Sequence, residues 1–276
     1  MDKLQIYYGI MYLFVFIFGV CIGSFLNVCI YRLPIGESLI KRNSHCMTCG
    51  TPIRKRDLIP VISWCMLKGK CHSCGAKISP RYTVVELLNG VLYLLVFLHF
   101  DVSIEPLYAA LVSLLFSALI VVFFMDWDTQ LINTYVVIFI GLLTIPSYLF
   151  TYRGSQEITL KSHIIGLFII SVPLLIISLA SKERAMGMGD VYLMAAGGLF
   201  LGMQGALVAM LVALITGSVM GLILKHLSGD SKFAFGPYLS IGIAVAALWS
   251  QEIGDWYLSF TGLNETLAEE AARLLI

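Results

Sequence analysis

The sequence predicts an all-α polytopic membrane protein of about eight transmembrane helices, with a small cytosolic zinc-knuckle module between the first two. Of its 276 residues, 59% are hydrophobic and only 13% are charged, and the mean hydropathy is +0.89. These values lie far outside the range of soluble globular domains. The only sizeable polar segment covers residues 31–82 and is called the cysteine module below.

The apolar runs of the chain are candidates for transmembrane helices, because a span needs about 20 apolar residues. The first run is too long, and too poorly flanked by a small-residue cleavage pattern, to be a removable signal peptide. We expect it to be retained as the first span. The sixth run is short and Gly-rich, so it could be a half-helix. The predicted spans are 8–30, 83–100, 107–125, 135–151, 163–180, 190–203, 205–225 and 234–251.

Lysine and arginine predict the orientation of the spans, since cytoplasmic loops carry an excess of both. Ten of the 18 lie within residues 32–81, together with only two acidic residues. If this segment is cytosolic, alternating spans place both termini outside and both Asp126 and Asp190 at cytosolic ends of spans. The formal net charge of +1 gives no reason to expect a nucleic acid partner. The basic segment is instead expected to face anionic lipid headgroups of the bilayer.

Two C-x-x-C knuckles stand in the cysteine module, Cys46 with Cys49 and Cys71 with Cys74, separated by 21 residues. Two such pairs at this distance predict a tetrahedral Zn²⁺ site with Zn–S bonds of about 2.3 Å. Four thiolates leave no coordination position for water, so we interpret the zinc as structural. The alternatives are unmetallated thiols or a redox pair, whereas disulfides are disfavoured in a reducing cytosol.

Other thiol and polar side chains near the knuckles have simpler explanations. Cys21 and Cys29 in the first span, and Cys65 in an apolar stretch, are expected to be ordinary buried thiols. His72 lies inside a knuckle, but a fifth ligand is not needed, so we expect it to be solvated or hydrogen-bonded. The basic run at 54–56 is expected to face solvent or lipid headgroups.

Two aspartates need a functional reason, because an ionisable group near hydrocarbon costs about 2.5 to 3.5 kcal/mol. Asp126 closes the third apolar run, and Asp190 ends the string Gly187-Met188-Gly189-Asp190. The glycines permit close backbone approach and unusual dihedrals just before a helix, whose N-terminus favours an ionised carboxylate. Two close carboxylates can hydrolyse a peptide without a metal, since one activates water while the other protonates the carbonyl oxygen.

Two further carboxylates lie near these positions. Asp128 follows Asp126 by two residues at the same span terminus, so spacing does not choose between them. The alternative for Asp128 is a solvated carboxylate or one that supports its neighbour. Glu86, inside the second span, must face protein or water rather than lipid. We expect Glu86 to make a polar contact that ties the helix leaving the cysteine module to the bundle, rather than to act in catalysis.

Several strings, in this order, resemble the bacterial prepilin peptidases, the GxGD-type aspartic leader peptidases and N-methyltransferases of type IV pilus, type II secretion and competence systems. The resemblance runs from Gly19 to about Trp249. The matching strings are GSFLNV (23–28), YRLP (31–34), the two C-x-x-C pairs, IPVISW (59–64), ISPRY (78–82), VELL (85–88), MDWD (125–128), GMGD (187–190) and FGPYL (235–239).

The resemblance implies specific roles for the residues in these strings. It assigns catalysis to Asp126 and Asp190, with Asp128 and the two motif glycines in support. The implied substrates are prepilins or pseudopilins, cleaved after the leader's glycine at the cytosolic face of the bacterial inner membrane. It also implies N-methylation of the new terminus, with S-adenosylmethionine as donor. That activity is associated with Gly69 and Lys70, for which the alternative is a turn and a solvated lysine.

The domain organisation follows from the same strings. We expect a first span at 1–30, the cysteine module with its methyl-transfer region at 31–82, a membrane-embedded aspartyl peptidase core at 83–251 and an external tail at 252–276. The end of this tail, 264–276, is typical of a short amphipathic helix. In one departure from the family, the Pro-Asp common after the first aspartate motif is here Asn133-Thr134.

Three other functions are compatible with parts of the sequence. A presenilin-like intramembrane aspartyl protease shares the two-aspartate chemistry, but the cysteine module argues against it. A proton-coupled transporter would carry its carboxylates near the middle of the membrane rather than at one face. A non-enzymatic assembly scaffold would tolerate the loss of either carboxylate.

Overall fold

The chain is all-helical in the computed structural model, as the sequence predicts, and the residues it describes contain no strand. These residues are 3–41, 43–101, 105–151, 160–184, 186–228 and 234–261. The amphipathic helix predicted at 264–276 lies outside them. The chain divides into two compact units, Met1–Arg153 and Gly154–Ile276, and each is described by itself.

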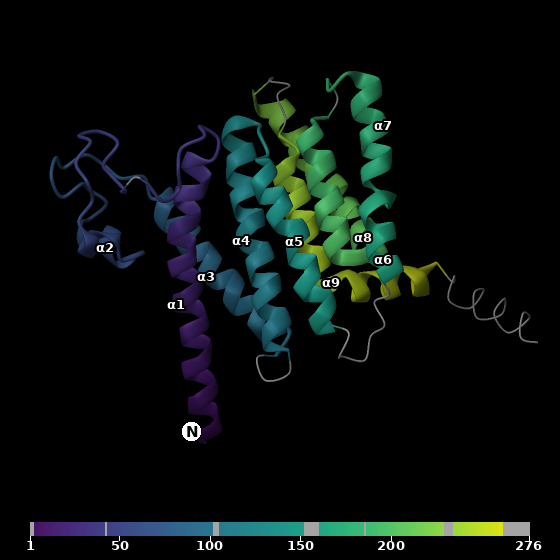
Figure 1. Cartoon of the computed structure of the whole chain (residues 1–276), viewed down its shortest axis with the longest axis horizontal. Helices are drawn as coiled ribbons and strands as arrows, with labels where there is room; N and C mark the ends of the chain where they lie inside the picture. Colours follow the sequence, from purple (N-terminus) through teal and green to yellow (C-terminus); the bar gives the residue numbers. More distant parts are fainter. Residues whose placement is uncertain are drawn as a thin grey trace, which may run out of the picture. The chain divides into compact units, whose positions relative to one another are not determined.

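Four long helices build the first unit: α1 (Lys3–Arg32), α3 (Arg81–His99), α4 (Pro106–Thr129) and α5 (Thr134–Thr151) (Figure 1). α1 and α3 are in close contact at two glycines. A Cβ built on Gly19 would lie only 2.9 Å from the Cα of Gly90, so a larger side chain does not fit there. A buried polar cluster joins α4 to α1 and α3. Asn89 donates to the carbonyl of Gly19 (2.6 Å) and accepts from the hydroxyl of Ser117 (2.9 Å). Such hydrogen bonds hold helices together where lipid offers no hydrophobic drive.

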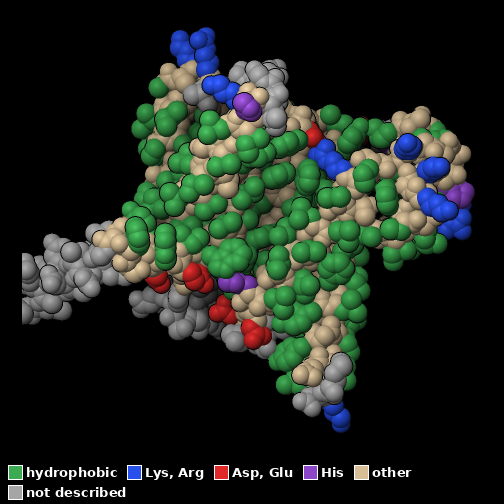
Figure 2. Space-filling view, turned by 180° about the vertical axis from the view of Figure 1, so that it is seen from behind, with side chains coloured by type: hydrophobic (Ala, Val, Ile, Leu, Met, Phe, Trp, Pro, Cys, Tyr) green, Lys and Arg blue, Asp and Glu red, His purple; other side chains and the backbone are tan. Residues whose placement is uncertain are grey.

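The cysteine module connects α1 to α3. It contains a short 3-10 helix, η1 (Lys55–Leu58), and a single-turn helix, α2 (Ile62–Met66). Figure 2 shows lysine and arginine side chains gathered on this module, whereas hydrophobic side chains cover the long helices. Many large apolar side chains of those helices are exposed, among them Phe14 (68%) and Leu142 (55%). This contrast fits a polar module attached to helices that face lipid.

The second unit contains α6 (Leu160–Ile169), α7 (Ser171–Ser181), α8 (Met188–Ser228) and α9 (Gly236–Phe260). α8 is interrupted at Gly202, where φ is 77° and ψ is −178°. A Cβ built on Gly198 would lie 3.3 Å from the Cβ of Ala206. Eight residues of continuous helix would instead separate these positions by about 12 Å. The chain therefore folds back at Gly202, and the two halves of α8 lie side by side.

Helix α6 packs against the turn in α8. The N–H of Met203 donates to the hydroxyl of Ser162 (3.1 Å), which satisfies a backbone donor at the start of the second half. Gly166 faces Gly198 so closely that a Cβ on either would clash with the other's backbone. α9 bends at Trp249 (φ −127°, ψ 20°), and the helix continues beyond it in another direction (Figure 1).

The helices agree with the predicted spans in position. By length and composition, five described segments could cross a membrane: Lys3–Arg32, Arg81–His99, Pro106–Thr129, Leu160–Ser181 and Met188–His226. α5 contributes a shorter apolar helix, Thr134–Leu149. Each predicted span falls on a helix, a helix pair or half of α8, and the break at Gly202 lies at the predicted boundary between the sixth and seventh. The total of eight stays a prediction.

The expectation of buried thiols is right for Cys29 but wrong for Cys21 and Cys65, which are exposed. Cys21 stands two residues from both Gly19 and Gly23, whose positions contact α3. Two residues correspond to about 200° around a helix, so Cys21 faces away from α3. Cys65 belongs to α2, a helix so short that only one of its residues is buried.

Candidate functional site

Asp126 lies in the last turn of α4 and is buried, with 5% of its surface exposed. The helix ends shortly after it, because Gln130 takes a left-handed conformation (φ 55°). The N–H of Gln130 donates to the Asp126 carbonyl at 2.9 Å, which closes the helix end. A carboxylate is thus held at the end of an apolar helix, where the sequence predicts it.

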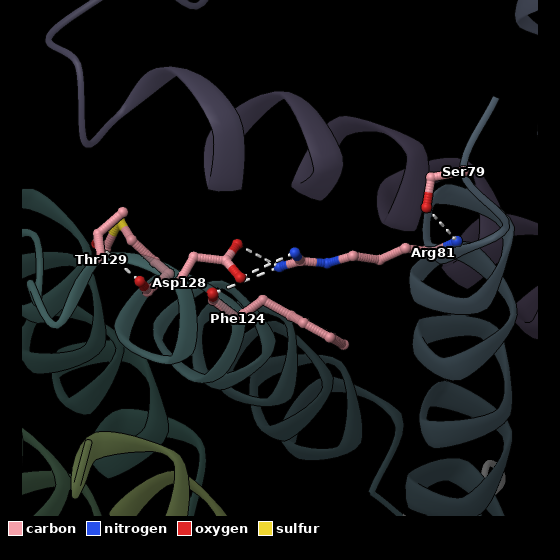
Figure 3. A network of polar contacts seen from close by, with 6 residues as sticks. Ser79, Arg81, Phe124, Asp128 and Thr129 are labelled. Carbon is pink, nitrogen blue, oxygen red and sulfur yellow. Dashed lines mark hydrogen bonds and ion pairs between the residues drawn. The ribbon is translucent and has the colours of Figure 1, made fainter. Parts of the chain in front are cut away.

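Asp128 is bound by Arg81, the first residue of α3 (Figure 3). Nη1 of the guanidinium donates to Oδ1 (2.9 Å) and Nη2 donates to Oδ2 (2.6 Å). Nη2 also donates to the carbonyl of Phe124 (3.4 Å), and the guanidinium lies 4.8 Å from the centre of that ring. Two-point pairing of this kind fixes geometry as well as charge. The pairing links the end of α4 to the start of α3. A supporting role of Asp128 in catalysis stays a prediction.

Arg81 was not singled out from the sequence. Its only sequence signal is its place in the string ISPRY, directly before the second span. In the structure it joins the exit of the cysteine module to the end of α4 that carries Asp126 (Figure 3).

Asp190 lies in the first turn of α8 and is buried, with 9% exposed. A Cβ built on Gly187 would lie 3.9 Å from Oδ2 of Asp190, so this glycine is next to the carboxylate. Neither Gly187 nor Gly189 has a positive φ, so neither takes the left-handed conformation that glycine permits. α8 begins at Met188, so Gly189 is already helical. The predicted position at a helix N-terminus, which favours negative charge, is confirmed.

The loop that leads to Asp190 is held by Ser178 of α7, which is fully buried. The Ser178 hydroxyl donates to the carbonyl of Met186 (3.0 Å) and lies 3.5 Å from the sulfur of Met188. These contacts fix the chain just before the aspartate. Asp126 belongs to the first unit and Asp190 to the second. Their action as a pair stays a prediction from the sequence.

The four cysteines of the module lie together as predicted. Their sulfur atoms are all within 4.8 Å of one another, and those of Cys46 and Cys74 are 3.9 Å apart. Four Zn–S bonds of about 2.3 Å in a tetrahedron place the sulfurs about 3.8 Å apart. The cluster of Cys46, Cys49, Cys71 and Cys74 therefore fits one tetrahedral metal ion.

The two knuckles have the same backbone structure. The N–H of Gly50 donates to the carbonyl of Cys46 at 2.8 Å. In the second knuckle, the N–H of Gly75 donates to the carbonyl of Cys71 at 2.9 Å. Both glycines have positive φ, 68° and 71°, a region in which a side chain would cause strain. Hydrogen bonds from the backbone N–H groups of Cys49 and Thr48 lower the pKa of the Cys46 thiol to about 6.

Glu86 forms the predicted link between the cysteine module and the helices. Its carboxylate accepts a hydrogen bond from the backbone N–H of Val61 (2.8 Å) and another from the Ser24 side chain. Val61 directly precedes α2 and has a φ of 62°, which is rare for a β-branched residue. The Glu86 carboxylate therefore holds a strained backbone position and joins the module to both α1 and α3.

Gly69 and Lys70 lie in a tight turn beside Trp64. Gly69 has a φ of 65°, and a Cβ on it would lie 2.9 Å from the Trp64 ring. The indole N–H donates to the carbonyl of Ile78 (3.2 Å), and the N–H of Ile78 donates to the carbonyl of Gly69 (2.7 Å). Gly69 thus has a structural reason to be glycine, and Lys70 is exposed. A role of either residue in methyl transfer stays a prediction.

A cavity of about 660 Å³ lies between the end of α1, the cysteine module and the start of α3. The lining includes Asn27, Tyr31, Glu37, Asp57 and Thr83. The sequence did not predict this cavity, because its walls come from positions spread over 24–86 that share no spacing pattern.

Comparison with known proteins covers both units. Residues 17–100 match the family model described as "Bacterial Peptidase A24 N-terminal domain", and residues 113–222 match "Type IV leader peptidase family". A "Prepilin leader peptidase/N-methyltransferase" of Aeromonas salmonicida is 32% identical over 93% of this chain and 98% of its own length. A protein of the same name from Legionella pneumophila is 30% identical over 91% of this chain and 95% of its own length. The "Type 4 prepilin-like proteins leader peptide-processing enzyme" of Escherichia coli O78:H11 is 34% identical over 91% of this chain and 98% of its own length. No solved structure gives a significant match.

Proposed function

This chain belongs to the type IV leader peptidase family, and we propose that it cleaves the basic leader from prepilins or prepilin-like proteins and then N-methylates the new terminus. The observation that carries the proposal is similarity, over more than nine tenths of the chain, to proteins named for both activities. Two buried aspartates at helix ends support the peptidase, and the four-cysteine cluster supports the resemblance of the module.

Asp126 and Asp190 are the proposed catalytic pair. The N-terminus of α8 favours the ionised form of Asp190, so Asp190 acts as the base. The C-terminal end of α4 disfavours negative charge on Asp126, so Asp126 stays protonated and acts as the acid. Asp190 takes a proton from water while the water oxygen attacks the carbonyl carbon of the leader's last glycine. Asp126 protonates the carbonyl oxygen at the same time.

Collapse of the tetrahedral intermediate then breaks the peptide C–N bond. The hydroxyl proton returns to Asp126, and the leaving amine takes the proton held by Asp190. One water is consumed, and the products are the free leader and a mature protein with a new N-terminal amine. The two carboxylates end in the protonation states in which they began.

The second proposed reaction transfers a methyl group from S-adenosylmethionine to this amine. The nitrogen lone pair forms the N–CH₃ bond as the S–CH₃ bond breaks, its electrons pass to sulfur, and a proton leaves the nitrogen for solvent. Gly69 and Lys70 are the proposed residues near this step. The four cysteines would hold one Zn²⁺ that stabilises the fold of the module and takes no part in the chemistry.

The membrane positions the substrate in this proposal. A prepilin is anchored by its apolar N-terminal helix, so its scissile bond lies at the inner membrane face, beside the basic leader. We place eight spans in the bacterial inner membrane, with the cysteine module and both aspartates on the cytosolic side. The gathering of lysine and arginine on the module supports this orientation (Figure 2).

The purified protein, reconstituted in lipid with a prepilin and labelled S-adenosylmethionine, tests the proposal. We expect release of the leader by cleavage after its glycine, followed by incorporation of label at the new N-terminus. A prepilin whose leader glycine is replaced by a bulky residue serves as the uncleaved control. Intact native prepilin after incubation with folded protein would show that the proposed function is wrong.

A further inference from the structure

Helix α9 changes direction at Trp249, and the part beyond the bend, 250–260, is called the distal segment below. Figure 1 shows the distal segment running across the direction of α8 rather than along it. The side-chain amide of Gln204, just after the turn in α8, donates to the carbonyl of Ser250 (3.1 Å). Gly254 lies so close to the same amide that a Cβ would not fit between them. The distal segment is therefore packed against α8 and held in this direction.

An aromatic face runs along the distal segment. The i, i+3, i+4, i+7 spacing of one helix face is followed by Ile253, Trp256, Tyr257 and Phe260. The three aromatic side chains are 63%, 54% and 78% exposed in this order, and the rings of Trp256 and Phe260 stack with their centres 5.7 Å apart. Large aromatic side chains gathered on one exposed face indicate a contact surface, whereas apolar side chains scattered singly do not.

The far side of the distal segment is polar. Gln251 and Asp255 are exposed there, and Glu252 lies at the border with the aromatic face. The distal segment has two acidic residues and no basic one. Basic residues attract anionic lipid headgroups and acidic residues repel them, so a neutral lipid surface suits this helix better. A helix with one apolar and one polar face binds in the plane of a bilayer surface, where one side meets lipid and the other meets water.

The length of α9 before the bend places the distal segment near lipid. This part, 236–249, is about 21 Å long at 1.5 Å per residue, whereas the hydrocarbon core of a bilayer is about 30 Å thick. A polar stretch, 228–232, precedes α9 in the sequence, so α9 starts near one membrane surface. The bend therefore lies no farther out than the opposite boundary between acyl chains and headgroups. The aromatic face can reach lipid from this position.

We infer that the distal segment is an interfacial helix that binds the surface of the bilayer, with its aromatic face against neutral lipid. Trp256 and Tyr257 suit this boundary because their rings are apolar with one polar group. Asp255, on the far side, faces water. The contact with Gln204 fixes the rotation of the helix, so the aromatic face is directed to the lipid. The inference rests on the membrane character of the chain and not on leader cleavage or methyl transfer.

Tryptophan fluorescence of the full-length protein in phosphatidylcholine nanodiscs tests the inference. Lipid with brominated acyl chains quenches an indole in the bilayer, and iodide quenches an indole in water. The difference between wild type and Trp256→Phe gives the emission of Trp256. We expect brominated lipid to quench this emission severalfold more strongly than iodide does, because the indole lies among acyl chains and headgroups.

Two double variants move the indole to other exposed positions of the same helix, so the fold should tolerate both. Trp256→Phe with Phe260→Trp keeps the indole on the aromatic face and should retain quenching by brominated lipid. Trp256→Phe with Asp255→Trp is the matched control, because it turns the indole to the polar side, where iodide should quench it instead.

Two results would overturn the inference. One is quenching of Trp256 by iodide as strong as that of the indole at position 255. The other is an indole at 256 and at 260 that neither quencher reaches, in nanodiscs whose mass shows two copies of the chain. That result would assign the aromatic face to a contact with a second copy rather than with lipid.

Discussion

Arg81 and Asp128 form a two-point ion pair, with N–O distances of 2.9 and 2.6 Å, that joins the exit of the cysteine module to the end of α4. Asp126 lies two residues before Asp128 in the same helical turn. The pair therefore fixes the position of the proposed acid relative to the module. Asp128 therefore links α4 to the start of α3, whereas Asp126 is the residue proposed for catalysis.

Arg81→Lys keeps the charge but loses the two-point geometry, so we expect leader release to slow severalfold. The free energy of unfolding should change by about 1 kcal/mol or less, because exposed pairs contribute little, and these side chains are 39% and 37% exposed. Rates of leader release and thermal unfolding measure the two effects. Arg56→Lys, at a 70% exposed arginine of the same module, is the control. Equal release by both variants would argue against a positioning role for the pair.

The cysteine cluster predicts about one zinc per chain. Cys46→Ser should lose most of the metal and make the module sensitive to protease, because the two knuckles would no longer be joined. Cys65→Ser is the matched control, since Cys65 is an exposed thiol of the same module outside the cluster. Metal analysis and limited proteolysis of the purified proteins provide the measurements. A Cys46→Ser protein that retains the full metal content would refute the site.

The turn in α8 predicts that Gly202 tolerates no side chain. Its φ is 77°, and a Cβ added at this position would lie 2.9 Å from the Ser162 hydroxyl oxygen. Gly202→Ala should therefore destabilise the protein by about 1 to 3 kcal/mol, which thermal unfolding of the purified protein measures. Gly9→Ala is the control, because Gly9 is helical and a Cβ there meets nothing within 4 Å. Equal melting temperatures of the two variants would contradict the described turn.

Much of the helix pattern could be predicted because apolar runs of membrane length leave few alternatives. The break between the sixth and seventh spans was visible as a short Gly-rich run, and Gly202 is where the chain turns. Exposure was less predictable. Apolar sequence does not distinguish a lipid-facing position from a packed one. The sequence therefore gives the same prediction for Cys21 and Cys29, although only Cys29 is buried.

The site was predictable in its residue types but not in its contacts. The C-x-x-C spacing predicts the sulfur cluster because each pair is local, and the structure confirms it. Glu86 was expected to tie the module to the helices, but its partner is a backbone N–H at Val61, 25 residues away. Arg81 and Asp128 are 47 residues apart, a separation for which no local spacing rule exists. Such contacts depend on how the helices pack.

The central claim is that Asp126 and Asp190 cut the leader. The most direct measurement compares leader release by Asp126→Asn, Asp190→Asn and the control Asp255→Asn, while methyl transfer to an already processed pilin is followed in the same preparations. Asp255 is exposed near the end of α9, so its variant should behave as wild type. We expect release to fall about a thousandfold or more in the first two variants, with methyl transfer retained. Leader release by either variant within about tenfold of the wild-type rate would contradict the two-aspartate mechanism.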